Sequence, residues 1–421
     1  MREIPLAYGS AALNFSFDED KFEILSPEPA AERPLTDIEI GLALDSPIDS
    51  PELDDVLSPG ESVLIVVSDA TRATGSAQIV NPLVRRIIQQ GVTAADIAVI
   101  FATGIHRPVT TEEKQKLLTS FITQRIKVLD HNFADESSLL LLGKTKGGDP
   151  IEVNRALRDF SRVVLTGGIG FHYFAGFSGG RKSICPGLAS EQTIAATHML
   201  ALNFEKGGRR TGVGAGLLEG NAVHEECERV AGMIHPAFSV NAVVDEWGRA
   251  VRVFAGDWRQ AHREGCGYYL KEHATNIAGK RDVVIVSCGG SPYDINLIQA
   301  HKALEMAANA CRDGGTIILL AECPDQFGRK DFLKWFAAEN AAALESRLRH
   351  SYEVNGQTAW ALLSKNERFR VLLISELDDE DVKRMRMFPV GSLSEAMSEV
   401  DPQAEGFILP RGAAFLPIPP G

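Results

Sequence analysis

Residues 63–72 read VLIVVSDATR, a run of five apolar residues followed by small polar and charged ones. A short apolar run that ends in polar residues is typical of a strand buried on both faces of a sheet. Helical periodicity follows over Ala77–Gln90 and ends at Gly91, and a second apolar run covers Ile97–Thr103. Because buried strands that alternate with helices pair in parallel, these residues predict a doubly wound α/β sheet.

The alternation extends through the first part of the chain. A helix is expected to begin near Thr110, where Glu113 completes the pattern of a capping box. Residues 1–60 contain acidic stretches and several prolines, so we expect irregular or short-stranded structure there. We expect further strands at Ile126–Leu129, Leu139–Leu142 and Arg162–Thr166, and a helix at Glu152–Phe160.

A second α/β pattern begins after about residue 270. Before it, Ser239–Asp245 and Arg249–Phe254 flank the turn Glu246-Trp247-Gly248, which predicts an antiparallel hairpin. A helix is expected to follow at about Trp258–Thr275. The alternation then resumes with a strand at Val283–Cys288, a helix at Asp294–Cys311 and a strand at Thr316–Leu320.

The chain has 421 residues, which suggests two or three domains at ~150 residues each. We predict two domains, residues 1–272 and residues 273–404, with the boundary near 270–280. Each is expected to hold a mainly parallel Rossmann-like sheet flanked by helices, with the active site in the cleft between the domains. The proline-containing end, about residues 405–421, is expected to pack back on the first domain.

Charge and composition narrow the choice of partners. Acidic residues outnumber basic ones by 56 to 43, and the resulting net charge of −13 repels nucleic-acid phosphates. The apolar runs are far shorter than a membrane span, and residues 1–10 lack the pattern of a signal peptide. We therefore expect a cytoplasmic protein with neither a nucleic-acid nor a membrane partner. The six cysteines form no C-x-x-C pair, and we expect them in the core.

Four segments share one design, in which an apolar strand runs directly into polar, reactive residues. In open α/β sheets, ligands bind beyond the carboxyl ends of the strands, where such loops converge. The four segments therefore predict a functional cleft. Besides two glycine pairs, they carry Arg72, His106, Arg107, His172, Gln299 and Lys302.

A glycine-rich turn, GFSGGRKS at residues 176–183, presents Lys182. It is not a P-loop, because that motif needs glycine where Arg181 stands, and Tyr173 occupies the third glycine position of a dinucleotide fingerprint. Lys182 is therefore either a surface lysine or an amine offered for phosphate binding or covalent attachment.

Two histidines lie in segments with helical patterns. His198 is near the end of a helix expected at Ser190–Leu200, and it is either a cation stabilised by the helix dipole or a metal ligand. His224 begins the sequence HEEC, which lacks the second histidine of a zinc-binding helix, so we expect a structural role for it.

Together these residues resemble the lactate racemase family, whose members use a nickel-pincer nucleotide. The resemblance spans most of residues 60–410, and the spacing of His172, Lys182 and His198 is its most specific part. It rests on SDATR at residues 68–72, GIHRP at 104–108, HYFAGFSGGRK at 172–182, Pro186-Gly187, His198, Gln299 and Lys302.

The resemblance implies a role for each of the most specific positions. Lys182 matches the lysine that holds the cofactor covalently through a thioamide. His198 matches the histidine that completes the coordination of the nickel ion. His106 and His172 match the two acid/base histidines that flank the bound 2-hydroxy acid.

The remaining matches concern binding. Asp69, Ala70, Thr71 and Arg72 match a loop that lies against the nucleotide. Positions that contact substrate in the family are matched by Arg72, Gln299, Lys302 and Trp360. Ile298 stands where lactate racemase itself carries a tyrosine, so the pocket differs. The acid is thus left open among lactate, malate, and short-chain, aromatic or sugar acids such as gluconate.

The implied reaction is racemisation or epimerisation at C2 of a 2-hydroxy acid, by reversible hydride transfer to the cofactor. Removing the hydrogen as hydride, while a base takes the hydroxyl proton, avoids a dianion and gives a planar 2-oxo acid. A histidine pKa near ~6.5 suits both proton-transfer roles. Arg72 and Lys302 would supply the cations that an anionic substrate needs on an acidic protein. The partners implied are this substrate and the enzymes that make the cofactor.

Two other classes of protein fit parts of the sequence. A nicotinamide-dependent 2-hydroxyacid dehydrogenase would share arginine and histidine in a Rossmann-like cleft, but the G-x-G-x-x-G motif is missing. A non-catalytic protein that binds the nickel nucleotide would not need both His106 and His172. The sequence leaves the oligomeric state open.

Overall fold

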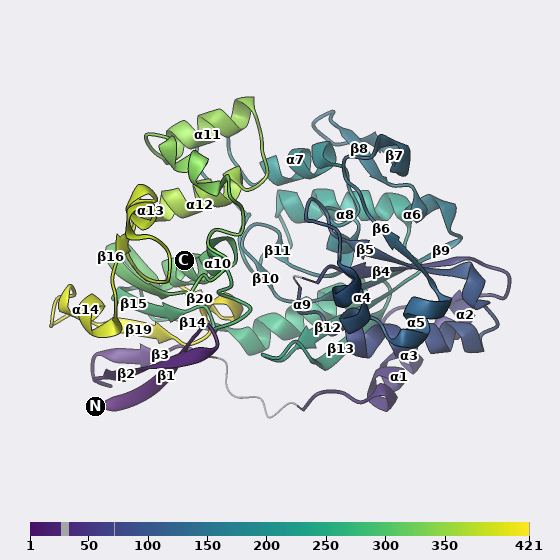
Figure 1. Cartoon of the computed structure of the whole chain (residues 1–421), viewed down its shortest axis with the longest axis horizontal. Helices are drawn as coiled ribbons and strands as arrows, with labels where there is room; N and C mark the ends of the chain where they lie inside the picture. Colours follow the sequence, from purple (N-terminus) through teal and green to yellow (C-terminus); the bar gives the residue numbers. More distant parts are fainter. Residues whose placement is uncertain (27–32, 71, 421) are drawn as a thin grey trace. The chain divides into compact units, whose positions relative to one another are not determined.

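The computed structural model describes residues 1–26, 33–70 and 72–420, and its strand β4 (Val63–Ser68) is the predicted buried run. β4 lies inside a six-stranded sheet with the strand order β13-β12-β9-β4-β5-β6 (Figure 1). Neighbouring strands pair in parallel, except that β12 and β13 form the predicted antiparallel hairpin. The other strands are β5 (Ile97–Ala102), β6 (Lys127–Asp130), β9 (Arg162–Gly168), β12 (Phe238–Val244) and β13 (Ala250–Gly256).

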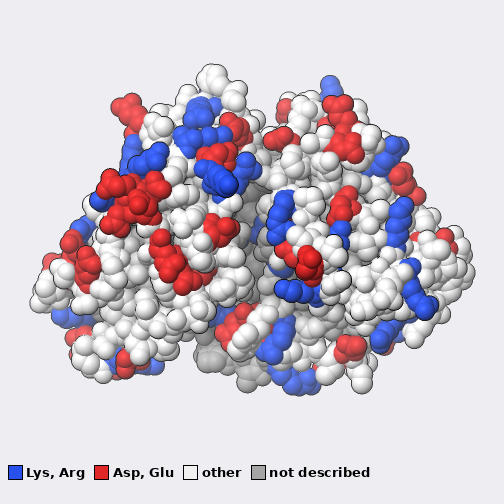
Figure 2. Space-filling model, in the orientation of Figure 1, with Lys and Arg blue, Asp and Glu red and all other residues white. Residues whose placement is uncertain are grey.

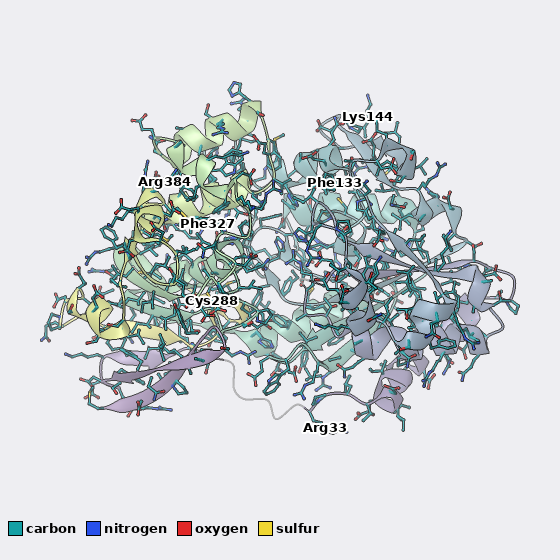
Figure 3. All side chains as sticks on the ribbon, viewed as in Figure 1. Arg33, Phe133, Lys144, Cys288, Phe327 and Arg384 are labelled. Carbon is teal, nitrogen blue, oxygen red and sulfur yellow. The ribbon has the colours of Figure 1, made fainter. Side chains whose placement is uncertain are left out.

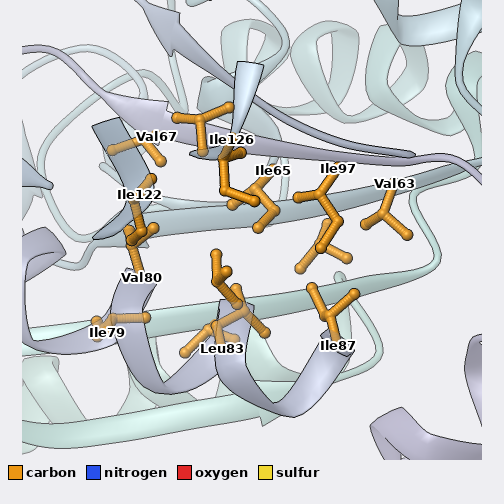
Figure 4. Close-up of a cluster of buried hydrophobic side chains, with 14 of the residues drawn as sticks. Val63, Ile65, Val67, Ile79, Val80, Leu83, Ile87, Ile97, Ile122 and Ile126 are labelled. Carbon is orange, nitrogen blue, oxygen red and sulfur yellow. The ribbon is translucent and has the colours of Figure 1, made fainter. Parts of the chain in front are cut away.

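Helix α3 (Ser76–Gln89) packs its apolar face against this sheet (Figure 4). Val80 and Leu83 of the helix belong to one buried cluster with Val63 and Ile65 of β4. Burying each such side chain stabilises the fold by about 1.5–3 kcal/mol. The strand and helix predicted from the pattern of apolar residues therefore form the centre of one core.

The remaining helices of this part of the chain surround the sheet. Thr110 caps α4, and the Glu113 side chain returns to the backbone of Thr110, which confirms the predicted capping box. The helices are α1 (Asp37–Asp45), α2 (Leu53–Val56), α4 (Thr111–Leu117), α5 (Ser120–Arg125), α6 (Ala156–Asp159), α7 (Glu191–Met199), α8 (Ala222–Ile234) and α9 (Gln260–His273).

The helix predicted at residues 152–160 is wrong. Strand β8 (Pro150–Asn154) covers the first part of that range, and only the four residues of α6 are helical. Ile151 and Val153 alternate as buried residues, and β8 pairs antiparallel with β7 (Leu139–Lys144). Strand pairing therefore overrides the helical pattern. β7 is a strand, as predicted, but it lies in this two-stranded sheet and not in the parallel one.

A second parallel sheet has the strand order β18-β17-β16-β15-β19-β3. Its strands are β3 (Phe22–Ile24), β15 (Arg281–Ser287), β16 (Cys311–Leu320), β17 (Arg370–Ile374), β18 (Phe388–Pro389) and β19 (Gly406–Leu409). Helix α10 (Leu297–Ala310) packs against β15 and β16. The hairpin of β1 (Arg2–Tyr8) and β2 (Ala11–Phe17) shares a buried cluster with β15. The other elements here are α11 (Ala341–His350), α12 (Gly356–Asn366), α13 (Asp379–Arg384), α14 (Leu393–Ser398), β14 (Ala274–Asn276) and β20 (Leu416–Ile418).

The chain divides into two compact units, each with one of these sheets. The first unit is Ala31–Ala201 with Arg210–Leu270, and the second is Met1–Ala30, Leu202–Arg209 and Lys271–Gly421. The division at residue 270 lies beside the boundary expected near 270–280. The N-terminal strands, however, belong to the second unit, because β3 completes the edge of its sheet beside β19.

The end of the chain also differs from the expectation that residues 405–421 pack back on the first domain. All four residues of β19 are buried, and β19 pairs in parallel with β15 and β3 of the second unit. β20 pairs with β14, which belongs to the same unit. An apolar strand joins the sheet edge that it can bury, whatever its distance along the sequence.

The cysteines lie in the core, as expected from the sequence. All six cysteines are buried and free, among them Cys288, which follows β15 (Figure 3).

In the part of the chain that the structure describes, no helix is both long and apolar enough to cross a membrane.

Replacing Phe22 with alanine should loosen the second sheet. The Phe22 ring lies so close to Gly406 of β19 that a Cβ on Gly406 would be 2.4 Å from it. Deleting a buried phenylalanine side chain costs about 3–5 kcal/mol. We expect a lower free energy of unfolding and faster amide hydrogen exchange in β15 and β19, measured by denaturant titration and mass spectrometry.

Phe388→Ala is the matched control, because Phe388 lies at the other edge of the same sheet and is 49% exposed. Its loss should cost about 1 kcal/mol or less. Equal losses in the two variants, or unchanged exchange in β19 of the Phe22 variant, would contradict the placement of β3.

Candidate active site

Three adjacent strands of the first sheet end in polar loops. β9, β4 and β5 run in parallel, so their carboxyl ends lie at one edge of the sheet. Asp69 follows β4, His106 comes shortly after β5, and His172 lies in β10 (Phe171–His172), just beyond β9. β10 pairs with β11 (Gly176–Phe177), which brings the start of the glycine-rich turn beside His172.

Asp69 and His106 form a close pair. Asp69 Oδ2 lies 2.7 Å from His106 Nδ1, with the carboxylate buried and the imidazole half-buried. The carboxylate accepts a hydrogen bond from Nδ1–H. In the neutral ring, the lone pair is therefore on Nε2. The negative charge also stabilises the imidazolium that forms when Nε2 takes a proton. The surroundings of His106 therefore suit a base.

His172 has the opposite arrangement. Its Nδ1 accepts a hydrogen bond from the backbone N–H of Ala175 at 3.3 Å. An accepting Nδ1 places the proton of the neutral ring on Nε2. At Nε2, the two histidines therefore present opposite hydrogen-bonding groups, a lone pair on His106 and an N–H on His172.

Phe174 contacts three of the predicted site residues. Its ring centroid lies 4.5 Å from that of His172 and 4.8 Å from that of His198, both edge to face. Lys182 Nζ lies 5.4 Å from the same centroid. Sequence alone gives Phe174 no role of its own, because a buried phenylalanine after a strand is typical of the core.

The turn that carries Lys182 is held by the ends of two strands. The backbone N–H of Gly180 donates to Asn241 Oδ1 of β12 at 2.8 Å. The Ser183 hydroxyl donates to the carbonyl oxygen of Thr166 in β9 at 3.0 Å. The position of the lysine is thus fixed relative to the sheet. No motif pointed to Asn241, because its partner is a backbone group far away in the sequence.

Arg181 ties the same turn to the interior. It is 1% exposed, and its Nη2 donates to the carbonyl oxygen of Ala175 at 2.6 Å. Its Nη1 lies 3.0 Å from His262 Nε2, which also lies 2.9 Å from the carbonyl oxygen of Ser178. Burial lowers the pKa of His262 well below its usual value, so the ring is neutral. Gly180 has a φ of +50°, and a Cβ there would lie 2.7 Å from the His262 ring. The turn is therefore a buried element that needs this glycine, and not an exposed loop.

The amine of Lys182 is the next feature of this turn. In the described ranges, Nζ makes no hydrogen bond or ion pair, and Phe174 is the ring beneath it. Burial, with the charges of Arg181 and Arg72 acting in the same direction, lowers the pKa of Lys182 to about 7. A large fraction of the amine is then unprotonated near neutral pH, which is the form a nucleophile requires.

His198 lies near the end of α7, as predicted, and is half-buried. Its Nε2 is shielded from solvent and has no hydrogen-bond partner among the residues that the structure describes. Burial, assisted by the charge of Lys182, lowers the pKa of His198 to about 3. The ring is therefore neutral near pH 7, which disfavours a dipole-stabilised cation and suits a metal ligand.

A metal ion at His198 would need ligands from a bound group. Over residues 1–26, 33–70 and 72–420, no cluster of three or more His, Cys, Asp or Glu side chains is arranged to hold a metal. Within these ranges the Lys182 amine and His198 Nε2 both lack polar partners, and both side chains contact the Phe174 ring. These residues fit an organic group that is held covalently by the amine and carries a metal toward the imidazole.

The loop after β4 contains the other predicted cofactor contacts. Asp69 is buried, Ala70 is half-buried and Arg72 is exposed, whereas Thr71 lies outside the described residues. The backbone N–H of Arg72 donates to the carbonyl oxygen of Asp69 at 3.2 Å, which closes a tight turn. Since the charge of Arg72 affects the pKa of Lys182, this loop adds positive potential near the amine.

The charges of the site differ from those of the surface. Acidic and basic side chains are interspersed on the face shown in Figure 2, and the net charge is −13. In the first unit, by contrast, the positive charges of Arg72 and Arg181 both act on Lys182. This local positive potential suits an anionic ligand.

The predicted contacts of the second unit lie on two helices. Gln299 and Lys302 are half-buried on the first turns of α10, where Lys302 Nζ donates to Gln299 Oε1 at 2.5 Å. Ile298, the residue that departs from the family pattern, is half-buried beside them. Trp360 lies in α12 and is 5% exposed, so most of its ring belongs to the core of this unit.

The chain matches known proteins along most of its length. Residues 8–209 match the lactate racemase N-terminal domain, and residues 277–409 match the lactate racemase C-terminal domain. Lactate racemase from Thermoanaerobacterium thermosaccharolyticum is 31% identical over 429 residues, which cover 99% of each chain. Lactate racemase from Lactiplantibacillus plantarum is 32% identical over 336 residues, which cover 79% of this chain and 77% of that one.

The fold is also similar to that of two solved structures. The lactate racemase apoprotein from Thermoanaerobacterium thermosaccharolyticum superposes with a TM-score of 0.90 and 29% identity, covering 99% of this chain and 100% of that one. A protein from Thermotoga maritima, at a TM-score of 0.69 and 20% identity, covers 92% of this chain and 99% of its own and shares the fold. The extent and identity of these matches show that the chain belongs to the lactate racemase family and is an isomerase.

Proposed function

We propose that this enzyme inverts C2 of a 2-hydroxy acid, with a nickel-pincer nucleotide attached at Lys182 and its nickel ion bound by His198. One observation carries the proposal. A half-buried amine and a shielded imidazole nitrogen, both without polar partners in the described residues, lie against one phenylalanine ring. Leaving polar groups unpaired in this way is costly, so it supports a ligand that completes both.

The nucleotide part would lie against the loop after β4. We assign Asp69, Ala70, Thr71 and Arg72 to contacts with the nucleotide, and the positive charge of Arg72 acts on Lys182. A phosphate group is stabilised by such cations. When bound, the cofactor supplies a centre that reversibly accepts the C2 hydrogen with its electron pair, which no side chain of this chain can do.

The chain itself supplies the proton transfers. For a substrate hydroxyl placed at His106, Nε2 takes the proton, and the buried Asp69 carboxylate stabilises the imidazolium that results. His172 serves the opposite enantiomer. To become a cation it gives up the 3.3 Å bond from Ala175 N–H, because Nδ1 must then carry a proton. The two histidines are therefore chemically unequal partners in one reaction.

The substrate carboxylate needs cationic partners. Arg72 is exposed and its guanidinium can bind a carboxylate through two parallel hydrogen bonds. We assign Gln299 and Lys302 of α10 to substrate binding as well, since their side chains already form a hydrogen-bonded pair. Trp360 would contribute only the small exposed part of its ring. The enzyme would obtain its cofactor from separate biosynthetic enzymes.

Replacing Lys182 tests covalent attachment. Lys182→Ala should remove the cofactor mass from protein made in a cofactor-producing host, since the bond requires the lysine nitrogen. Lys182→Arg should behave in the same way, because a guanidinium stays protonated and is a poor nucleophile. Intact-mass spectrometry measures the result. Cofactor mass that persists on either variant would refute the covalent attachment.

Replacing His198 should separate metal binding from attachment. We expect His198→Ala to retain the organic mass on Lys182 but to lose most of its nickel, because the only proposed protein ligand is gone. His350→Ala, at the end of α11, is the control and should keep its nickel. The measurement is the nickel content per attached cofactor. If His198→Ala holds nickel as tightly as the control, the proposed ligand is wrong.

Replacing either His106 or His172 should slow racemisation in both directions. Loss of one acid/base group costs about 10²–10⁴ in rate. Because the two enantiomers are equally stable, kcat/KM must fall by the same factor in each direction. Optical rotation or chiral chromatography on a panel of 2-hydroxy acids measures both directions. Full activity of His172→Ala would exclude the two-base mechanism.

A further inference from the structure

The glycine pair that follows β15 is covered by the start of the chain. Gly289 and Gly290 lie beyond the carboxyl end of this strand, where ligands bind in open α/β sheets. Here the turn between β1 and β2 reaches the same place, and the carbonyl oxygen of Gly9 accepts from the backbone N–H of Ser291 at 2.8 Å. A Cβ on Gly290 would lie 2.8 Å from that oxygen. At this position the glycine pair therefore makes room for the chain's own hairpin.

Asp294 holds the hairpin from the other side. Its side chain is 0% exposed, and its Oδ2 accepts from the backbone N–H of Gly9 at 2.7 Å and from that of Glu322 at 3.4 Å. In the described residues no cation lies within ion-pair distance of this carboxylate, and Oδ1 has no hydrogen-bond partner. A buried carboxylate held only by backbone groups is unfavourable for folding. Its presence at this contact points to a role beyond packing.

The residues after Asp294 lead directly into α10. Asn296 is the N-cap of this helix, and its Oδ1 accepts from the backbone N–H of Gln299 at 3.0 Å. The side chain of Gln299 in turn accepts a hydrogen bond from Lys302. The two proposed substrate contacts of α10 therefore lie at the start of the helix that directly follows the loop of Asp294.

The loop after β16 holds the same stretch of chain in a strained conformation. The backbone N–H of Cys323 donates to the carbonyl oxygen of Asp294 at 2.9 Å. The backbone N–H of Leu297 donates to the carbonyl oxygen of Gln326, also at 2.9 Å. Cys323 and Gln326 have φ values of +58° and +50°, a region that residues other than glycine rarely adopt. Such strain persists where the surroundings fix it, and it clusters at functional sites.

We propose that the contact of Asp294 with Gly9, here called the hairpin lock, positions the start of α10 and so sets the place of Gln299 and Lys302. Asp294 is a positioning residue, because it is fully buried and acts through the loop that leads into the helix. The whole lock lies within the second unit. Its effect on substrate binding rests on the proposed function, whereas its effect on the start of the helix does not.

The first test measures amide hydrogen exchange in the apoprotein. Gly9→Ala strains a residue with a φ of +56° and would place a Cβ 1.9 Å from Glu322 Oε2. We expect exchange over residues 295–302 to become about tenfold faster, because the strain favours local opening of the lock. Exchange in β4 of the first unit should stay as in the wild type.

Gly314→Ala is the matched control for backbone strain in the same unit. Gly314 has a φ of +78°, but a Cβ there would meet nothing within 4 Å. Exchange over residues 295–302 should therefore match the wild type in this variant. Unchanged exchange there in Gly9→Ala, or an equal increase in both glycine variants, would overturn the proposal.

Two replacements of Asp294 test the carboxylate. Asparagine keeps an oxygen that can accept from the Gly9 N–H, whereas alanine leaves that N–H without its partner. Exchange over residues 295–302 should rise in Asp294→Ala and return close to the wild-type rate in Asp294→Asn. Wild-type exchange in Asp294→Ala would overturn the role of the carboxylate. If Asp294→Ala does not fold, the comparison of Gly9→Ala with Gly314→Ala decides.

Kinetics of the cofactor-loaded enzyme separate positioning from a general loss of stability. In Gly9→Ala and Asp294→Ala we expect KM for the 2-hydroxy acid to rise about tenfold, with a smaller change in kcat. Asp294→Asn should restore KM, and the cofactor mass on Lys182 should be unchanged in every variant. A lower kcat at unchanged KM would overturn the link to substrate binding. If the wild type racemises no 2-hydroxy acid, the proposed function fails, while hydrogen exchange still decides whether the lock positions α10.

Discussion

The candidate site depends on the parallel pairing of β4 with β5 and β9. Parallel strands end at the same edge of a sheet, so Asp69, His106 and His172 are brought to one place although more than a hundred residues separate the first from the last. β9 also supplies the carbonyl oxygen of Thr166, which accepts a hydrogen bond from the Ser183 hydroxyl. If this register slipped, the proposed acid/base residues and the lysine turn would lose their common edge.

Burial determines the protonation states that the proposed chemistry needs. Desolvation disfavours charged groups, so near pH 7 it leaves His198 neutral and a large fraction of Lys182 unprotonated. The buried guanidinium of Arg181 acts in the same direction on the lysine. A covalent nucleophile and a metal ligand both require the unprotonated form, so a single physical cause serves two roles. Among the described residues these two groups have no polar partner, so burying them is unfavourable and the packing of the rest of the fold must offset it.

The central part of the first sheet could be predicted from the pattern of apolar residues along the sequence. The alternation of apolar runs with helical periodicity predicts β4, α3 and β5 and the parallel sheet, because buried strands and amphipathic helices have distinct periods. The same approach failed at Glu152–Phe160, where cross-strand pairing with β7 outweighs the helical pattern. The sequence pattern also assigned residues 405–421 to the first domain, whereas β19 pairs with β15 of the second unit. Strand order depends on which sheet edge an apolar segment can cover, and the pattern along the chain does not contain that information.

By itself, the sequence determined the fold class, the strand-end residues and the family resemblance, because these depend on composition, periodicity and spacing along the chain. Only the tertiary structure decided the surroundings of each residue. It brought Phe174, Asn241 and His262 to the lysine turn, and it gave His106 and His172, the proposed acid/base pair, opposite proton positions. The physical reason is that desolvation and hydrogen-bond partners depend on neighbours in space, and those neighbours come from strands and helices remote in sequence.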